Sequence, residues 1–402
     1  MFKTLDDVDV SGKTVLVRVD INSPVVDGQV QDNPRINAAA GTLKELSDKE
    51  AKVVVLAHQG RPGDKDFTNL EQHAELLTKH VGKTVMFIDD IYGEKAIHKI
   101  RTLKKGDILL LDNVRSLKEE MAKVTPEEHS KAEFVQTLAK EAELFVIDAF
   151  SAAHRGQASL VGFMFLLPTV VGREMQHELE SLEKIKSEKA VLILGGAKPE
   201  DSLEIIRHFS EKQILQSVLT TGIVAQVFTA AKDIEMGEPE KFLKDNDYWN
   251  FVPKAKELLD KIEASENAGD IKIPIDMITE SKKIVTIYDM PIKEKIYDIG
   301  PKTCDKYENI IKAAKFIVLN GTAGLVEEGF SEGTKRIFTA VAESDAFSLV
   351  GGGHSISAIE EFKIPKEKFS FISLAGGALI SYLSGKKMPV LECLKTAKGS
   401  KT

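Results

Sequence analysis

The chain has 402 residues, of which 43% are hydrophobic and 29% are charged. That composition is typical of a globular protein, and the length is too great for one ordinary core, so we expect two domains. The net charge is −8 and no long acidic or basic block occurs, which argues against a general nucleic-acid surface.

The sequence gives no indication of export or of a membrane segment. The N-terminal residues carry acidic side chains where a signal peptide would carry basic ones. The longest nearly apolar run, residues 160–171, is too short to span a bilayer. Cys304 and Cys393 fit neither a disulfide framework nor a zinc pattern, so we expect a reducing cytoplasm as the location.

Short apolar runs alternate with longer amphipathic stretches along the chain, which is typical of parallel sheets covered by helices. In the first part the expected strands are Lys13–Asp20, Lys52–Ala57, Thr84–Phe87, Asp107–Leu111 and Leu144–Asp148. In the second part they are Ala190–Leu194, Ser217–Thr220, Lys283–Ile287, Phe316–Leu319 and Phe347–Val350. The predicted fold class is therefore α/β, with two doubly wound, Rossmann-like parallel-sheet lobes joined by a hinge helix.

The predicted boundaries follow from these runs. We expect a first lobe over residues 1–168, a connecting helix over 169–186, and a second lobe over 187–378. Residues 379–402 are expected to return to the first lobe. The highly charged stretch 232–270 is predicted to be a solvated helical excursion without chemistry of its own.

Charged and polar side chains follow the strands of the first lobe. They are Asp20, Asn22, Arg35, His58, Arg61, Arg115, His154 and Arg155. A single arginine after a strand would be interpreted as a solvated loop charge. Four arginines and two histidines at one edge of a sheet instead predict a site for a small, highly anionic ligand, because guanidinium groups match phosphate and carboxylate oxygens.

The second lobe has glycines at its strand-to-helix turns. Gly195-Gly196-Ala197-Lys198 follows one expected strand, Asn320-Gly321 follows another, and Gly351-Gly352-Gly353-His354 follows a third. Glycines let backbone N–H groups approach phosphates at a helix N-terminus, although packing could explain any one such turn. Several turns together with Lys198 predict a nucleotide phosphate site.

In order and spacing, these strings resemble the phosphoglycerate kinase family over nearly the whole chain. Residues 18–24 resemble the family's RVDFN opening, 58–62 its HLGRP, 112–115 its ENLR, and 148–155 its DAFGxAHR. Residues 195–198 resemble GGAK, 298–303 resemble DIGPxT, and 320–327 resemble NGPxGVFE.

The resemblance implies direct phosphoryl transfer from 1,3-bisphosphoglycerate to ADP, with Mg²⁺ on the nucleotide, no metal held by the protein alone, and closure of the lobes by hinge bending. It implies that Arg35 and Lys198 are catalytic. It also implies phosphoglycerate contacts from Asp20, Asn22, Arg35, His58, Arg61, Arg115 and Arg155, with His154 beside them. The implied nucleotide-binding residues are Gly195, Gly196, Lys198, Asn320, Glu327, Gly351, Gly352, Gly353 and His354, with Glu327 at the ribose hydroxyls.

The chain departs from the usual family pattern at several nucleotide-site positions, which are Ser202, Thr221, Thr322, His354 and Leu374-Ala375. Ser202 stands where the family has a lysine, and His354 replaces the aspartate of GGGD. These two changes resemble the archaeal branch of the family.

Two other functions remain open from the sequence. One is a catalytically impaired paralogue that binds an anionic metabolite, which the Arg35 and Lys198 pair argues against. The other is a nicotinamide dehydrogenase, which the absence of a G-x-G-x-x-G string and the arginine-rich first lobe argue against.

Overall fold

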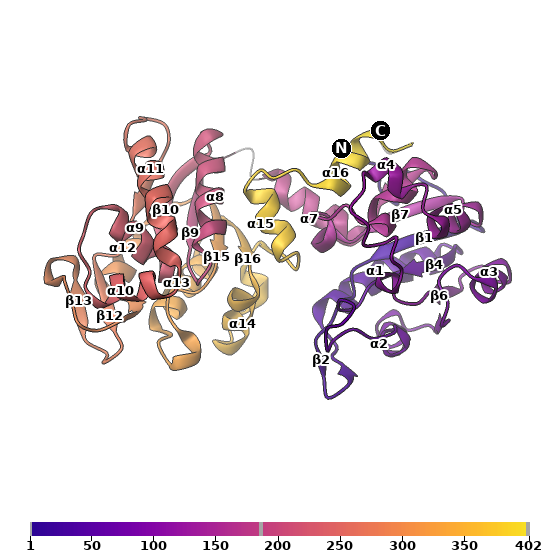
Figure 1. The fold of residues 1–402 in the computed structure, drawn as a ribbon, viewed down its shortest axis with the longest axis horizontal. Helices are drawn as coiled ribbons and strands as arrows, with labels where there is room; N and C mark the ends of the chain where they lie inside the picture. The colour runs from indigo at the N-terminus through magenta and orange to yellow at the C-terminus, as the bar shows by residue number, and fades with distance from the viewer. Residues whose placement is uncertain (1, 185–187, 399–402) are drawn as a thin grey trace. The chain divides into compact units, whose positions relative to one another are not determined.

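The computed structural model describes residues 2–184 and 188–398. These residues form two compact units (Figure 1). The first comprises the described residues up to 180 together with those from 387 onward, and the second comprises those from 181 to 386.

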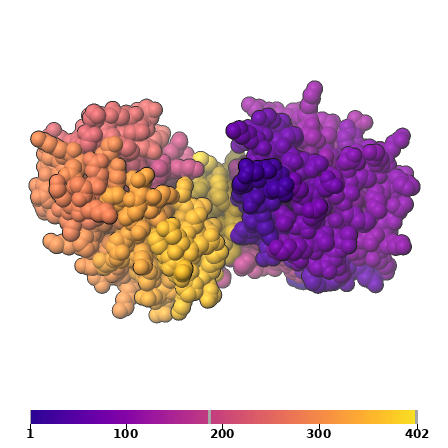
Figure 2. Space-filling view, turned by 90° about the horizontal axis from the view of Figure 1, so that it is seen from below, coloured from indigo at the N-terminus to yellow at the C-terminus, as the bar shows by residue number. Residues whose placement is uncertain are grey.

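The first unit is built on a six-stranded parallel sheet in the order β5-β6-β4-β1-β7-β8. The strands are β1 (Thr14–Val19), β4 (Lys52–Leu56), β5 (Val85–Phe87), β6 (Ile108–Leu110), β7 (Leu144–Asp148) and β8 (Thr169–Val171). Beside them lies a hairpin of β2 (Val25–Val26) and β3 (Gln29–Val30), in which Val26 is 54% exposed. The indigo N-terminal part of this unit, to which the hairpin belongs, is visible on the face shown in Figure 2. From β1 the chain adds β4, β5 and β6 on one side of β1, and then crosses over to add β7 and β8 on the other side. The carboxyl ends beside β1 are therefore the switch point where ligands of open sheets bind.

Helices pack on this sheet through apolar stripes. They are α1 (Pro34–Asp48), α2 (Glu71–Val81), α3 (Glu94–Arg101), α4 (Pro126–His129), α5 (Glu133–Lys140), α6 (Ala158–Val161), α7 (Arg173–Glu183) and α16 (Pro389–Thr396). In α1, Asn33 caps the first turn by accepting from the Arg35 N–H at 2.8 Å, and Pro34 stands at a position that needs no hydrogen bond. That cap fixes where the Arg35 side chain leaves the helix.

The second unit has a parallel sheet in the order β11-β10-β9-β15-β16-β17. Its strands are β9 (Ala190–Leu194), β10 (Leu215–Thr220), β11 (Asp270–Lys272), β15 (Phe316–Asn320), β16 (Phe347–Gly351) and β17 (Phe371–Ile372). A small antiparallel sheet contains β12 (Asp276–Thr279), β13 (Ile284–Thr286) and β14 (Ile296–Ile299). The helices are α8 (Pro199–Glu211), α9 (Gly222–Ala231), α10 (Glu238–Asp245), α11 (Val252–Glu263), α12 (Pro301–Ala313), α13 (Glu332–Glu343), α14 (Gly353–Glu361) and α15 (Gly377–Leu383).

Two parallel α/β sheets are present, which confirms the predicted fold class. Two expectations about local structure are wrong. The run Lys283–Ile287 contributes β13, which lies in the antiparallel sheet and not in the parallel one. Residues 169–171 form the edge strand β8, so α7 begins at Arg173, and residues 185–187 of the expected connecting helix and its end lie outside the described residues. Within the stretch 232–270, Phe242 of α10 lines the cavity described below.

None of the described helices is long and apolar enough to cross a bilayer.

Candidate active site

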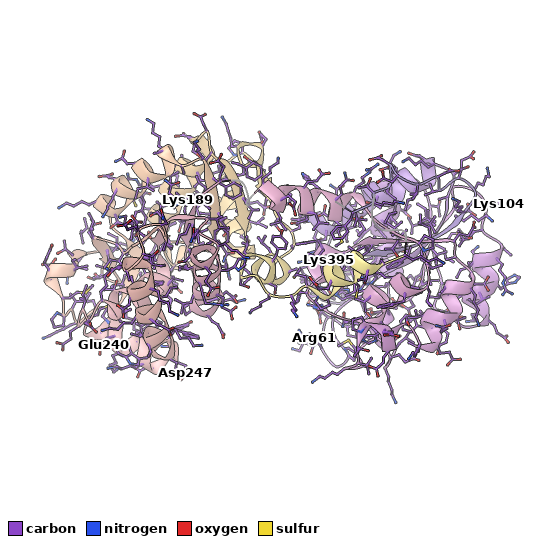
Figure 3. The ribbon with its side chains drawn as sticks, turned by 90° about the horizontal axis from the view of Figure 1, so that it is seen from above. Arg61, Lys104, Lys189, Glu240, Asp247 and Lys395 are labelled. Carbon is purple, nitrogen blue, oxygen red and sulfur yellow. The ribbon has the colours of Figure 1, made fainter. Side chains whose placement is uncertain are left out.

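The residues predicted for an anionic ligand gather at the carboxyl edge of the first sheet. Asp20 directly follows β1, His58 follows β4, Arg115 lies in the turn after β6, and His154 and Arg155 come after β7. Arg35 reaches this edge from the first turn of α1, where its side chain is 32% exposed. Arg61, labelled in Figure 3, is the exposed member of the group.

Asp20 joins several of these groups. Its Oδ2 lies 3.4 Å from Arg35 and accepts from the Ser151 hydroxyl, and its Oδ1 lies 4.0 Å from His58 Nδ1 and accepts from the Asn22 N–H at 3.1 Å. Burial alone would raise the pKa of Asp20, but the positive charge of Arg35 and the hydrogen bonds from Ser151 and the Asn22 N–H outweigh it and hold the pKa well below its usual value. Asp20 is therefore an ionised carboxylate that orients Arg35.

His58 is held in one protonation state by Arg18. The Arg18 guanidinium always carries its protons, so its Nη2 donates to His58 Nδ1 across 3.0 Å. Burial, followed by repulsion from the neighbouring arginines, lowers the pKa of His58 far below its ordinary value and outweighs the attraction of Asp20. A neutral His58 with its proton on Nε2 follows, which makes that nitrogen a donor.

Arg18 belongs to a buried network that the sequence analysis did not assign. Its side chain is fully buried, and its Nε donates to the Ser159 hydroxyl at 2.8 Å, which in turn donates to Glu120 at 2.7 Å. Burial raises the pKa of Glu120, and the charge of Arg18 opposes that rise. The available signal was a lone cation inside the apolar strand Val15–Val19.

The loops that carry these side chains are tied together by two buried amides. Gln59 bonds the backbone of Ser23 on one loop and accepts from His73, while Asn113 bonds the backbone of Gln59 on both sides. Asn22 accepts from the Gly60 N–H at 2.8 Å, so it supports the turn before Arg61. A side chain on Gly60 is excluded, because a Cβ there would lie 2.6 Å from the backbone of Asp66.

The arginines of this edge are costly to keep together without a ligand. Burial and repulsion from Arg155 and Arg18 lower the pKa of Arg115 to about 10. The Arg115 Nε is buried and has no hydrogen-bond partner among the described residues. The pKa of Arg155 is lowered by burial despite Asp20, and that of His154 falls to about 4, again mainly through burial. An anion bound at this edge would offset the excess of partly buried positive charge.

In the second unit, three strand-to-helix turns are joined by backbone hydrogen bonds. The Gly195 N–H donates to Asn320 O at 3.0 Å, and the Gly196 N–H donates to Thr322 O at 2.9 Å. The Gly222 N–H donates to Ala323 O at 3.1 Å. Glycine is required at position 222 because two backbone segments lie in contact there. A Cβ on Gly222 would lie 2.8 Å from Gly196 N, and the residue has a φ of +55°. These turns open α8 and α9 at the edge of the sheet.

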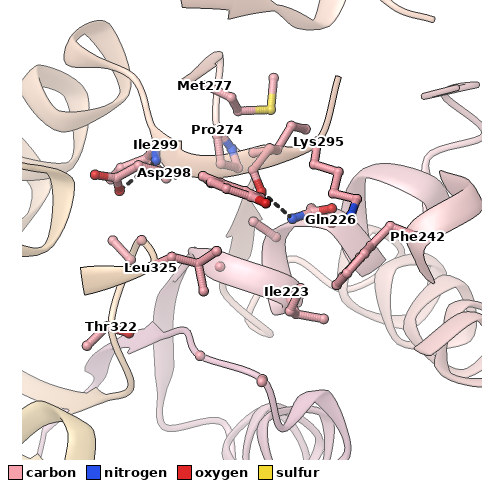
Figure 4. A pocket seen from close by; sticks show the side chains of 18 of the residues that line it. Ile223, Gln226, Phe242, Pro274, Met277, Lys295, Asp298, Ile299, Thr322 and Leu325 are labelled. Carbon is pink, nitrogen blue, oxygen red and sulfur yellow. Dashed lines mark hydrogen bonds between the residues drawn. The ribbon is translucent and has the colours of Figure 1, made fainter. Parts of the chain in front are cut away.

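Beside these turns lies a cavity of about 250 Å³ (Figure 4). Three residues predicted for the nucleotide line it, namely Gly196, Glu327 and His354. Other lining residues were not foreseen, among them Ile223, Gln226, Phe242, Met277, Lys295 and Tyr297. They come from α9, α10 and the antiparallel sheet, whose packing no local sequence signal reveals.

The remaining predicted residues lie around the cavity without lining it. Gly352, with φ +88°, approaches Asn320 so closely that a Cβ would lie 2.8 Å from the Asn320 Oδ1. Gly353 begins α14, and Lys198, which is exposed, stands at the N-cap of α8. Gly195 and Gly351 are buried in their turns.

Asp298 supports the cavity wall. Both of its oxygens accept backbone N–H groups, from Gly333 at 2.9 Å and from Ile299 at 2.8 Å. Burial nevertheless raises its pKa to about 7. The carboxyl group holds the start of α13 against β14, and Gly324 packs on it where the chain turns toward Glu327.

Comparison with known proteins decides which family this site belongs to. A family model described as phosphoglycerate kinase matches residues 5–386. The chain belongs to the phosphoglycerate kinase family. It is 42% identical to the phosphoglycerate kinase of Methanococcus maripaludis, with 98% of each chain covered. It is 40% identical to that of Saccharolobus solfataricus, covering 97% of this chain and 96% of the other.

Solved phosphoglycerate kinase structures share the fold over nearly the whole chain. The crystal structure from Pyrococcus horikoshii OT3 has a TM-score of 0.86 at 37% identity and covers 98% of both chains. The structure from Coxiella burnetii has a TM-score of 0.84 at 28% identity, covering 99% of this chain and 100% of the other. The chain is thus an ATP-dependent phosphotransferase of glycolysis that interconverts 1,3-bisphosphoglycerate and ADP with 3-phosphoglycerate and ATP. None of these relatives supports an impaired paralogue or a dehydrogenase.

Proposed function

We propose that the cationic edge of the first sheet binds the phosphoglycerate. The observation that carries this assignment is the excess of partly buried arginines, because an anionic ligand relieves their repulsion and satisfies the unpartnered Arg115 Nε. Neutral His58 donates from Nε2, and ionised Asp20 keeps Arg35 in place. The full set of proposed contacts is Asp20, Asn22, Arg35, His58, Arg61, Arg115, His154 and Arg155.

The nucleotide is proposed to bind at the glycine turns and cavity of the second unit. Its phosphates would take backbone N–H groups at the start of α8 and α14, where the helix dipoles favour negative charge. Glu327 lines the same cavity and would accept from the ribose hydroxyls. The proposed contacts are Gly195, Gly196, Lys198, Asn320, Glu327, Gly351, Gly352, Gly353 and His354.

Catalysis by this site needs alignment and charge neutralisation more than covalent help. Arg35 and Lys198 are proposed to offset the negative charge of the phosphoryl group as it passes between the acyl oxygen and the nucleotide. Each cationic residue stands at the start of a helix, Arg35 in the first turn of α1 and Lys198 at the N-cap of α8. 3-Phosphoglycerate differs from 1,3-bisphosphoglycerate, and ADP from ATP, only by the transferred phosphoryl group. The same residues therefore serve the reaction in both directions.

Mg²⁺ is proposed to enter as part of the nucleotide substrate. In the part of the chain that the structure describes, no three Asp, Glu, His or Cys side chains gather as a metal site. His354 takes the position that lines the cavity near the phosphate turns. Because Mg²⁺ keeps several waters and prefers hard oxygens, phosphate and water ligands suit it here.

The cytoplasm is proposed as the place of action, and no nucleic-acid partner is proposed. Both cysteines are buried free thiols, which suits a reducing compartment. The excess of negative charge disfavours binding to a polyanion.

Calorimetric titration of variants at two exposed positions tests whether the first unit binds 3-phosphoglycerate and the second unit binds ADP. Arg61→Met should weaken 3-phosphoglycerate binding by roughly tenfold, the worth of one charge-assisted hydrogen bond, and leave ADP binding unchanged. Glu327→Gln should do the reverse. Arg101→Met, which removes another exposed arginine of the first unit, should change neither affinity. The assignment is wrong if Arg61→Met weakens ADP binding or leaves 3-phosphoglycerate binding intact.

A further inference from the structure

The first turns of α8 carry three carboxylates beside Lys198. They belong to Glu200, Asp201 and Glu204. Acidic side chains stabilise the start of a helix through its dipole, but here they also attract the Lys198 ammonium and repel the nucleotide phosphates proposed to bind at this end. Burial raises the pKa of Asp201, and the positive charges of Lys198 and Lys386 oppose that rise. Both lysines therefore act on the same acidic group.

Helix α8 has no cation of its own near these carboxylates. Ser202 stands where the family has a lysine, and its side chain is buried. The first basic residue within the helix is Arg207, which lies 3.6 Å from Glu211 at the opposite end. Apart from Lys198 itself, a cation that offsets the three carboxylates must therefore come from another part of the chain.

The end of α15 supplies that cation. This helix packs against α8, and the Lys386 Nζ lies 2.5 Å from the Glu204 Oε2 (Figure 1). The turn that places Lys386 there is tight: its N–H donates to Ser381 O at 2.9 Å, and Gly385 before it has a φ of +71°. A side chain on Gly385 is excluded, because its Cβ would overlap the His208 ring of α8. The close packing of this turn directs Lys386 to Glu204.

Resting on the proposed catalytic role of Lys198, we propose that Lys386 is a positioning residue that offsets the carboxylates of α8 and keeps the Lys198 ammonium available to the transferred phosphoryl group. The contact with Glu204, and after it the charge of Asp201, raises the pKa of Lys386, so this side chain stays protonated. Lys198 forms no ion pair with the residues that the structure describes. Without Lys386, the uncovered Glu204 carboxylate adds to the charge that draws Lys198 toward α8 and repels the phosphates.

Steady-state phosphorylation of 3-phosphoglycerate by ATP tests this role in Lys386→Met. We expect kcat to fall roughly fivefold at low ionic strength, the upper worth of a partly exposed ion pair, while KM for 3-phosphoglycerate stays constant. The loss should shrink in about 1 M KCl, where the Debye length is about 3 Å. Lys386→Arg keeps the charge and should retain the wild-type kcat. Lys366→Met is the matched control, because Lys366 also lies 2.5 Å from a carboxylate, that of Glu360, and is also 50% exposed; its kcat should not change.

A double variant separates charge compensation from a purely structural ion pair. Adding Glu204→Gln to Lys386→Met removes the carboxylate that Lys386 offsets, so most of the lost kcat should return. Both variants lack the same ion pair, so a role limited to bracing α15 against α8 would leave the double variant as slow as Lys386→Met.

A wild-type kcat in Lys386→Met, or no recovery in the double variant, overturns the role proposed for Lys386 while leaving the kinase activity in place. A near-wild-type kcat in Lys198→Ala would instead refute the catalytic role of Lys198 on which this inference rests, so the two failures are distinguishable.

Discussion

Replacing Arg18 with methionine should destabilise the first unit severely. The guanidinium and the Glu120 carboxylate are both fully buried and are bridged by the Ser159 hydroxyl through hydrogen bonds of 2.8 and 2.7 Å. Arg18→Met keeps most of the side-chain volume but leaves Glu120 buried without its counter-charge. Removing one partner of a buried ion pair in direct contact costs about 3–5 kcal/mol, and that range is the upper end for this pair, which is linked through the Ser159 hydroxyl.

Hydrogen–deuterium exchange of the β1 and β7 amides measures this loss in the first unit alone. Because 1.4 kcal/mol corresponds to a factor of ten, protection of these amides should fall by roughly a hundredfold or more. Adding Glu120→Gln to the variant should restore part of the protection, since the carboxylate that lost its counter-charge is then removed.

The matched control is Arg101→Met. Arg101 also pairs with a carboxylate, at 2.6 Å from Glu141, but its side chain is 66% exposed. Exposed pairs contribute about 0–1 kcal/mol, so protection should change less than tenfold. Equal effects of Arg18→Met and Arg101→Met, or no recovery with Glu120→Gln, would refute the reasoning about the buried network.

Three further outcomes are expected. Arg35→Ala and Lys198→Ala should each lower kcat by about 10²-fold or more with a smaller change in KM, because each removes a donor that stabilises charge in the transition state. Steady-state kinetics measure both constants, and a near-wild-type kcat would show that the replaced residue is not catalytic. His354→Asp should add an anionic oxygen ligand and lower the Mg²⁺ concentration needed for half-maximal activity, whereas His354→Ala should leave that concentration unchanged. Both are measured by magnesium titration at fixed nucleotide concentration. If the aspartate variant shows no shift, position 354 does not face the metal. Burial raises the pKa of Asp148 to about 6, so the folded chain holds this proton more tightly than the unfolded chain, and stability falls as pH rises from about 4 to 6. Asp148→Asn should therefore gain up to about 3 kcal/mol over wild type across that window, measured by exchange of first-unit amides at pH 4 to 7, and a constant difference would contradict the assigned pKa.

The sequence was sufficient for most of the two parallel sheets. Buried strands such as Ala190–Leu194 are short apolar runs bounded by glycines, and that signal is local. Thr169–Val171 was missed because a three-residue strand after a proline is too short to show a period. Ile284–Thr286 has the same alternation in an antiparallel sheet as in a parallel one, so only tertiary pairing separates the two.

The site was predictable to the extent that its residues follow strands. Arg35, His58 and Arg155 stand where chain topology alone brings them to one edge. Gln226 and Lys295 could not be predicted as cavity residues, because neither follows a strand of the parallel sheet. Each lies within a helix or before a short strand, and they share a cavity only because α9 packs beside β14.

Formation of ATP from ADP and enzymatically generated 1,3-bisphosphoglycerate tests the central claim most directly. A coupled assay of the purified protein should show ATP production that requires both substrates and Mg²⁺, and that falls by about 10²-fold in Arg35→Ala. Tight binding of both ligands by calorimetry without any ATP formation would contradict the account.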